Sequence, residues 1–519
     1  MTYSTMEERQ FPAMHKNFNT KNHGAITLGR QAMRAGLCVM LCLQSGCMVG
    51  PKYQPPAGTT ESLSAAYKET PGHFKESKDW KVARPEDAML RGAWWKVFHD
   101  PELNALEDDL NINNQNIKVS FENFMQARAL IAEADSQLYP TLTLNGSATR
   151  SKVPLASPAT AIITAVDLSW EPDLWGKVRN AIRNAQYNAQ LSAADLENER
   201  LTEQTALAVF YFQIRGQDSL QKLFNDTVVA DKKALDYNKA QYDTGITDKI
   251  SVVEAENTLQ NVQASATNIG VARAQFEHAI AMLTGRVASN FSIPVKPLQN
   301  TPPTIPTGMP SQLLERRPDI AAAERAMAAA NAQIGAAYAA YYPSVTLDAS
   351  GGFQNRKLGH LFDASNRTWS IGPSVSETVF DAGLRTATVH QFIATYNGAL
   401  ATYRQTVLTG FQQVEDNLAG TRILSKQLGQ QRDAEESAKI VLDLELNRFQ
   451  TGIDPYLDVV TAQTTLLTDQ QAVINVQVQS MTSAVQLVEA LGGGWDRSQL
   501  PSPADVSKPP TPEQTAIQH

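Results

Sequence analysis

The sequence predicts a mainly α-helical chain that contains two copies of one long helical hairpin and four β-strands. The first observation is a tandem repeat, because residues 176 to 285 resemble residues 383 to 493. The repeat keeps its internal spacing, since 69 residues separate the matching glycines of each copy, Gly176 from Gly245 and Gly383 from Gly452. Spacing that is held over this length indicates a rigid element.

The second observation is that both copies allow uninterrupted helix. No proline occurs between Pro172 and Pro294, or between Pro373 and Pro455. Apolar residues recur at spacings of three and four, as an amphipathic or coiled-coil helix requires, among them Val178, Ile182, Leu207, Phe210 and Ile214. A helix of about 69 residues would be roughly 100 Å long, which is far longer than an ordinary globular domain needs.

The third observation is a period-two alternation of apolar and polar residues ahead of each long helix. It covers residues 141–144 and 162–170 in the first copy, and residues 344–348 and 370–379 in the second. Each pair predicts a β-hairpin with one apolar and one polar face. The sheet is either a small amphipathic layer on a soluble protein or part of a membrane barrel. Membranes accept strands only in closed barrels of about eight strands or more, so several chains would have to share one barrel.

The N-terminus predicts export. Residues 36–43 form a short apolar stretch that follows Arg30 and Arg34, which is typical of a signal peptide at residues 1–46. Met33 is a candidate for the true start. Ser45 and Gly46 precede Cys47 and resemble a bacterial lipoprotein box, although Gln44 stands where leucine is usual. We therefore expect a covalent N-terminal lipid on Cys47; the alternative is a signal peptide with an incidental cysteine.

Cysteine content and charge limit the remaining possibilities. Cys38 and Cys42 lie in the predicted signal, so the exported chain keeps only Cys47 and has no disulfide. The full chain carries a net charge of −8, and removal of residues 1–46 leaves 40 basic and 51 acidic residues, a net charge of −11. The chain has no basic tail or patch, so nucleic-acid binding is not predicted.

Glycine, proline and capping residues define the hairpin ends and the linkers. Gly245 fits a helix C-cap and Thr247 an N-cap, while Asp454 fits an N-cap that is followed by Pro455 at the first helical position. The expected organisation after the signal is a lipidated segment and linker (47–100), a first repeat (101–285), a proline-rich connector (286–310), a second repeat (311–493) and a disordered tail (494–519).

Several segments resemble the TolC-like outer-membrane efflux proteins, in particular their lipoprotein branch. These segments are 47–53, 94–103, 314–320, 342–343, 380–383 and 448–452. They occur in order across residues 47 to 493. The resemblance implies a homotrimer in which twelve strands form one membrane β-barrel in the outer membrane, continued by an α-helical barrel across the periplasm.

The resemblance also implies a function. Such proteins are the exit ducts of tripartite efflux pumps, and they conduct substrates passively from a periplasmic membrane-fusion adaptor and an inner-membrane transporter, most often of the resistance–nodulation–division type. The adaptor would meet the helical tips at Gly245, Ile246, Gly452 and Ile453. Three copies of Asp458 would form an acidic ring at the periplasmic aperture, although Thr461 occupies one position where the family often has aspartate. The alternative for Asp458 is a solvated carboxylate at a helix start.

Catalysis is not predicted. The eight histidines show no zinc-like spacing, and no phosphate-binding glycine loop, nucleophile elbow or Cys–His pair is present. We expect no catalytic residues, no metal and no cofactor beyond the lipid, and we interpret the many helical Asp and Glu residues as solvated. The alternative function is a lipid-anchored periplasmic coiled-coil scaffold without a pore. The exported substrate is not encoded in the chain.

Overall fold

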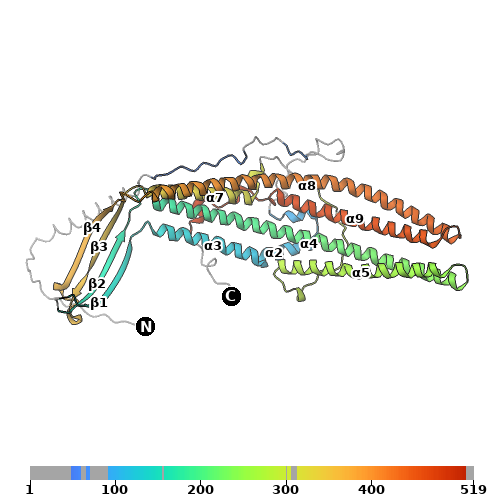
Figure 1. Ribbon diagram of the computed structural model, residues 1–519, viewed down its shortest axis with the longest axis horizontal. Helices are drawn as coiled ribbons and strands as arrows, with labels where there is room; N and C mark the ends of the chain where they lie inside the picture. Colours follow the sequence, from blue (N-terminus) through green and yellow to red (C-terminus); the bar gives the residue numbers. More distant parts are fainter. Residues whose placement is uncertain are drawn as a thin grey trace, which may run out of the picture. The chain divides into compact units, whose positions relative to one another are not determined.

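The computed structural model describes residues 48–59, 66–69, 92–154, 157–299, 301–305 and 312–509 (Figure 1). The predicted signal peptide and Cys47 lie outside these residues. The chain divides into two compact units. The smaller unit comprises the strands and the segments next to them, within residues 138–179 and 339–379, and the larger unit comprises the helices.

The smaller unit confirms the four predicted strands. They are β1 (Thr141–Ser151), β2 (Ala159–Trp170), β3 (Ser344–Asn355) and β4 (Arg367–Ser376). The strands form one antiparallel sheet in the order β1-β2-β3-β4. Strands β1 and β4 are therefore its two edges, and each repeat contributes one hairpin.

The strand register sorts the side chains onto an apolar and a polar face, because directly opposite residues share a face. One row runs from Leu144 through Val166 and Gly351 to Trp369. The same apolar face also holds Leu142, Leu168, Leu347, Ile371 and Val375. The opposite face holds Thr143, Asn145, Asp167, Thr346, Asp348, Ser350, Ser370 and Ser374. The predicted alternation is thus confirmed on all four strands.

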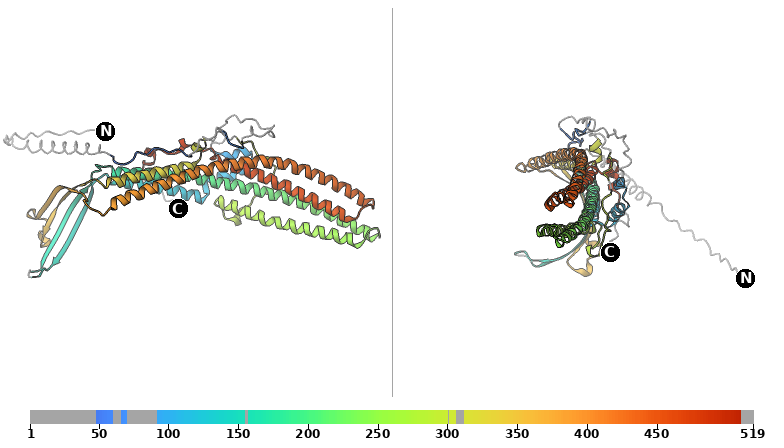
Figure 2. Two further views of the ribbon diagram at one scale, coloured as in Figure 1. Left: turned by 45° about the horizontal axis from the view of Figure 1, so that its top comes forward. Right: turned by 90° about the vertical axis from the view of Figure 1, so that its right-hand side faces the viewer.

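The larger unit confirms the duplicated hairpins. Helices α4 (Lys177–Asp243) and α8 (Leu384–Gln450) have 67 residues each, and α5 (Lys249–Leu283) and α9 (Tyr456–Ala490) have 35 each. Each helix of the second copy begins 207 residues after its counterpart (384 − 177 and 456 − 249). A 67-residue helix is roughly 100 Å long. Helix α9 contacts α8 and α5, and Figure 2 shows the long helices α4, α5, α8 and α9 side by side in a curved layer.

Shorter helices pack along the long ones. They are α2 (Pro101–Asn113), α3 (Gln115–Ser136), α6 (Leu313–Arg316) and α7 (Pro318–Ala339), with short 3₁₀ turns such as η2 (Trp94–Phe98) and η3 (Ala288–Asn290). The largest apolar core lies where η2 and α2 meet the middle of α4 and the ends of α5 and α9, and its fully buried side chains include Trp94, Leu103, Tyr211, Phe212, Ile280 and Val485. Among the described residues, no helix has an apolar stretch long enough to span a membrane.

The prediction of a disordered tail is wrong for residues 494–509; residues 510–519 lie outside the described part. The 3₁₀ turn η7 (Arg497–Gln499) and the helix α10 (Pro503–Val506) are formed. Val506 is buried against Ile131 and Ala189, and Ser502 caps α10 through a reciprocal capping box. Two apolar anchors, Trp495 and Val506, therefore order a segment whose proline content suggested disorder.

Two of the predicted helix caps are also wrong by one residue. Asp248, not Thr247, is the N-cap of α5, and its carboxylate accepts the backbone N–H of Ser251 at 3.1 Å. Pro455, not Asp454, is the N-cap of α9. The carboxylate of Asp454 instead accepts a hydrogen bond from Arg448, which removes it from the role of cap.

Candidate functional site

The tips of the two helical hairpins have the same backbone structure. Gly245 and Gly452 adopt positive φ angles of 77° and 72°. At each tip the glycine N–H and the following isoleucine N–H close a Schellman motif, with bonds from Ile246 to the carbonyl of Gln241 and from Ile453 to that of Arg448. Both isoleucines are exposed, at 74% and 67%. The four predicted tip residues therefore present one apolar side chain per hairpin to solvent.

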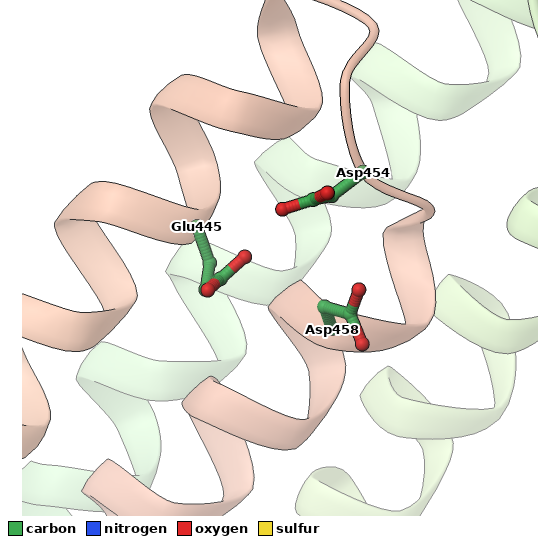
Figure 3. Close-up of side chains that lie close together, drawn as sticks. All are labelled: Glu445, Asp454 and Asp458. Atoms are coloured by element: carbon green, nitrogen blue, oxygen red, sulfur yellow. The ribbon is translucent and has the colours of Figure 1, made fainter.

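Asp458 lies beside the second tip in a cluster of three carboxylates (Figure 3). Oxygen atoms of Glu445, Asp454 and Asp458 lie within 4.8 Å of one another. Asp454 also accepts a hydrogen bond from Nη2 of Arg448 at 3.0 Å, and this contact raises the pKa of the Arg448 guanidinium. Asp458 is exposed in the first turn of α9, where the helix dipole favours a negative charge. The cluster therefore carries a net negative charge at the hairpin end.

The segment behind the tips packs through a small apolar cluster, with a buried acid close to it. Its buried residues are Leu235, Ala255, Leu259, Tyr456 and Val459. Asp231 lies one turn before Leu235 on α4 and is only 4% exposed. Its Oδ2 has no hydrogen-bond partner among the described residues, and burial raises the pKa of Asp231 to about 6. The expectation that the helical acids are solvated is therefore wrong at this position.

The polar face of the sheet carries a cross-strand set of hydrogen bonds. Nδ2 of Asn145 donates to Oδ2 of Asp167 at 2.6 Å. The hydroxyl of Ser169 donates to Oδ1 of Asp348 at 2.8 Å, and Thr346 and Ser374 share a bond of 2.6 Å. These contacts link all four strands on one face and present hydroxyl, amide and carboxylate groups to water.

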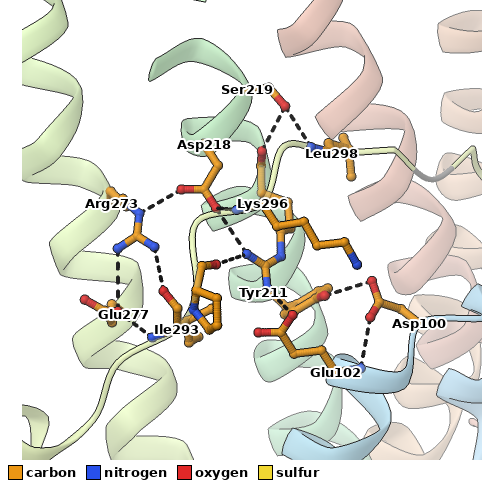
Figure 4. A network of polar contacts seen from close by, with 12 residues as sticks. Asp100, Glu102, Tyr211, Asp218, Ser219, Arg273, Glu277, Ile293, Lys296 and Leu298 are labelled. Carbon is orange, nitrogen blue, oxygen red and sulfur yellow. Dashed lines mark hydrogen bonds and ion pairs between the residues drawn. The ribbon is translucent and has the colours of Figure 1, made fainter. Parts of the chain in front are cut away.

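A buried ion network in the larger unit centres on Asp218 of α4 (Figure 4). Its carboxylate accepts bonds from Nε of Arg273 at 2.7 Å, Nη1 of Arg215 at 3.1 Å and the backbone N–H of Lys296 at 2.9 Å. Arg215 also forms an ion pair with Glu102 at 2.6 Å. The network therefore ties α4 to α5, to α2 and to the connector after α5. Sequence reasoning missed it, because the Asp and Glu residues on the helices were interpreted as solvated.

The first described residues after Cys47 pack against the segment that precedes α4 and against α7. A side chain on Gly176 would lie 2.8 Å from Met48, and the N–H of Val49 donates to the carbonyl of Trp175 at 3.2 Å. Farther along, Cβ on Gly50 would lie 2.5 Å from Cα of Gly335. The start of the described chain is thus held closely.

Candidate ligand groups are few in the described part of the chain. Glu445, Asp454 and Asp458 form its only set of three side chains with metal-ligand spacing, and Arg448 already neutralises one of them. A cavity of about 510 Å³ is lined by Arg317, Asp319 and Thr/Gln-rich residues between 401 and 413. The guanidinium of Arg317 is engaged by Asp319 and by the carbonyl of Ala490, so the cavity offers no free cation.

Comparisons with known proteins agree with this architecture. The family model described as "Outer membrane efflux protein" matches residues 106–286 and 309–493. The solvent efflux pump outer membrane protein SrpC of Pseudomonas putida is 30% identical over 88% of this chain and 98% of its own length. The cation efflux system protein CusC of Escherichia coli is 27% identical over 89% of this chain and 98% of its own length. The open-state structure of the Neisseria gonorrhoeae MtrE outer membrane channel superposes with a TM-score of 0.77 at 25% identity, over 87% of this chain and 99% of that one.

Proposed function

Because this chain belongs to the outer membrane efflux protein family, we propose that it is the exit duct through which a tripartite efflux pump releases its substrates outside the cell. It is an outer-membrane efflux channel with its helices in the periplasm, and thus a transport protein. A scaffold without a pore is not favoured, since its relatives are outer-membrane efflux proteins and channels.

The observation that carries the proposal is an amphipathic sheet with two open edges. In lipid, every backbone group needs a partner, so a four-stranded sheet cannot span a membrane alone. Three copies that pair β1 of one with β4 of the next would close twelve strands. The apolar face would then meet lipid, and the hydrogen-bonded polar face would line a water-filled lumen.

Size and conductance of the purified protein test the duct. We expect a trimer in detergent that forms ion-conducting pores in planar bilayers. A Cys47→Ser variant, which removes the lipidation site, should still need detergent and still conduct. A monomer that stays in aqueous extracts without surfactant would contradict the proposal.

Within the duct, we assign the periplasmic aperture to the end of the second hairpin. The acidic cluster of Glu445, Asp454 and Asp458 supports this, since three copies would place a ring of carboxylates around the entrance. The exposed isoleucines beside Gly245 and Gly452 would give the adaptor an apolar contact on each hairpin.

Lipidation of Cys47 is also part of the proposal. Close packing of Met48 and Val49 against Gly176 and Trp175 supports it, because the lipidated residue would then be attached near the sheet-forming segment. Mass spectrometry of the mature N-terminal peptide tests it. An unmodified cysteine would overturn this part alone.

The partners would be a periplasmic membrane-fusion adaptor and an inner-membrane transporter of the resistance–nodulation–division type. We expect no catalytic activity. One relative belongs to a solvent efflux pump and another to a cation efflux system, so the proposal names no substrate. Co-purification with the adaptor, and its loss when Ile246 and Ile453 are both replaced by Asp, tests the tip contact.

A further inference from the structure

The loop end of the β-sheet concentrates positive charge in a chain whose net charge is −8. Five basic residues lie near the loop ends of the strands or in the two hairpin connections, and all are exposed: Arg150, Lys152, Arg356, Lys357 and Arg367. Asp363 is the only acid in these connections, and it already contacts His360 at 3.1 Å. The hairpin connections are therefore basic on balance.

Two of these residues lie on the apolar face of the sheet. Arg150 is opposite Thr160 and belongs to the same alternating set as Leu142. Arg367 is opposite Phe353 and shares its face with Val375 and Trp369. The other basic residues, Lys152, Arg356 and Lys357, lie beyond the strand ends.

The two arginines mark the border of an apolar band. Each arginine lies eight positions from the apolar residue at the opposite, helix-joined end of its strand. Arg150 lies eight positions after Leu142, and Arg367 lies eight positions before Val375. Eight residues of strand extend roughly 26 Å, close to the height of about 25 Å expected for the apolar band of an outer-membrane barrel. Trp369 is 79% exposed two residues inside the border, where aromatic side chains favour the interface between lipid and water.

The edge positions of β1 and β4 bring these arginines toward each other in the trimeric duct proposed above, on which this inference rests. Strand β1 of one copy would pair with β4 of the next, so Arg150 and Arg367 would reach the same border of the same seam. Two cations beside lipid are unfavourable unless an anion neutralises them. Guanidinium groups bind phosphate in a planar, bidentate manner.

We propose that Arg150 of one copy and Arg367 of its neighbour form a binding site for the phosphate of an outer-leaflet lipid headgroup, with three sites per trimer. The loop end of the sheet faces the exterior, because both hairpins join the periplasmic helices at their other end. Basic residues near a membrane surface strengthen the binding of anionic lipid.

Lipid binding by the purified trimer tests the site. The probe is lipid A with both phosphates, compared with lipid A from which both have been removed, and binding is followed by native mass spectrometry. We expect the phosphates to be required. The Arg150→Gln/Arg367→Gln variant should bind about 25-fold more weakly, at about fivefold per residue removed. The Arg150→Lys/Arg367→Lys variant should retain part of the binding, because it keeps the charge and loses the bidentate geometry.

The matched control is Arg356→Gln/Lys357→Gln, which removes the same charge from the connection and leaves the apolar face intact. We expect binding within about twofold of the wild type, because these two residues lie beyond the end of β3 and outside the proposed bidentate phosphate contact. Equal loss in the control, or binding without phosphates, would overturn the assignment. If the double glutamine variant does not assemble, the lysine variant and the dephosphorylated lipid still decide the matter. A trimer that conducts but ignores the phosphates refutes only this site, whereas absence of a conducting trimer refutes the duct.

Discussion

Replacing Asp231 with asparagine should stabilise the packing of the helical tips at neutral pH. The substitution should also make the stability of this packing independent of pH. The side chain is 4% exposed, and its Oδ2 has no partner among the described residues. Burial raises the pKa of Tyr456 on α9 to about 12, and the nearby carboxylates of Asp231 and Glu254 add to this effect, so Asp231 lies close to Tyr456 of the apolar cluster. None of these groups is a cation, so ionisation of Asp231 is not compensated.

The sign and the size of the effect follow from linkage. Burial raises the pKa of Asp231 from 3.8 to about 6. Because the packed state binds the proton more tightly than the open state, its stability is complete below about pH 4 and falls as pH rises through about 6. Two pKa units correspond to about 3 kcal/mol. Water that enters the seam between the helices reduces this, and we expect about 2 kcal/mol between about pH 4 and pH 7.5.

Hydrogen exchange of the amides in α4, α5 and α9 near the tips measures this opening directly. After correction for intrinsic exchange, wild-type protection should fall by about 30-fold from acid to neutral pH, whereas the Asp231→Asn variant should keep it. Asp236→Asn on the exposed side of α4 is the control and should behave as the wild type. Equal pH dependence in all three proteins would refute the reasoning.

Three further predictions concern other parts of the chain. Asp458→Asn should lower the preference of the pore for cations about twofold, measured as a reversal potential in a salt gradient; no change would remove Asp458 from the aperture. Asp218→Ala removes the carboxylate that Arg215 and Arg273 share, although each arginine keeps a second acid, and should cost about 3 kcal/mol in thermal unfolding. Asp226→Ala removes only an exposed pair and should cost under about 1 kcal/mol. Gly452→Ala should destabilise the tip by about 1 kcal/mol because of its positive φ, whereas Gly429→Ala in open space within α8 should not.

The sequence predicted the repeats and the strands because these elements depend on periodicity. The 69-residue spacing and the proline-free segments led to helices of equal length in both copies. The alternation between residues 162 and 170 led to a strand with one apolar and one polar face. Such patterns are local, so they can be recognised without knowledge of tertiary contacts.

The remaining features depend on tertiary contacts that no local pattern records. Val506 orders the tail through contact with residues more than 300 positions away, so a proline-rich composition was misleading. Asp218 and Asp231 look like solvated helical acids until neighbouring helices cover them. The N-cap of α5 was predicted one residue too early, because Thr247 and Asp248 are both suitable cap residues. The structure shows that the carboxylate of Asp248 accepts the N–H of Ser251.

The two unpaired edges of each sheet have a genetic consequence. A copy with a damaged edge strand would still carry the other, intact edge and would still enter assemblies. If normal and damaged copies are made in equal amounts and mix freely, only about one trimer in eight contains none of the damaged kind. Such alleles should therefore be dominant over the normal one, in contrast to alleles that prevent export altogether.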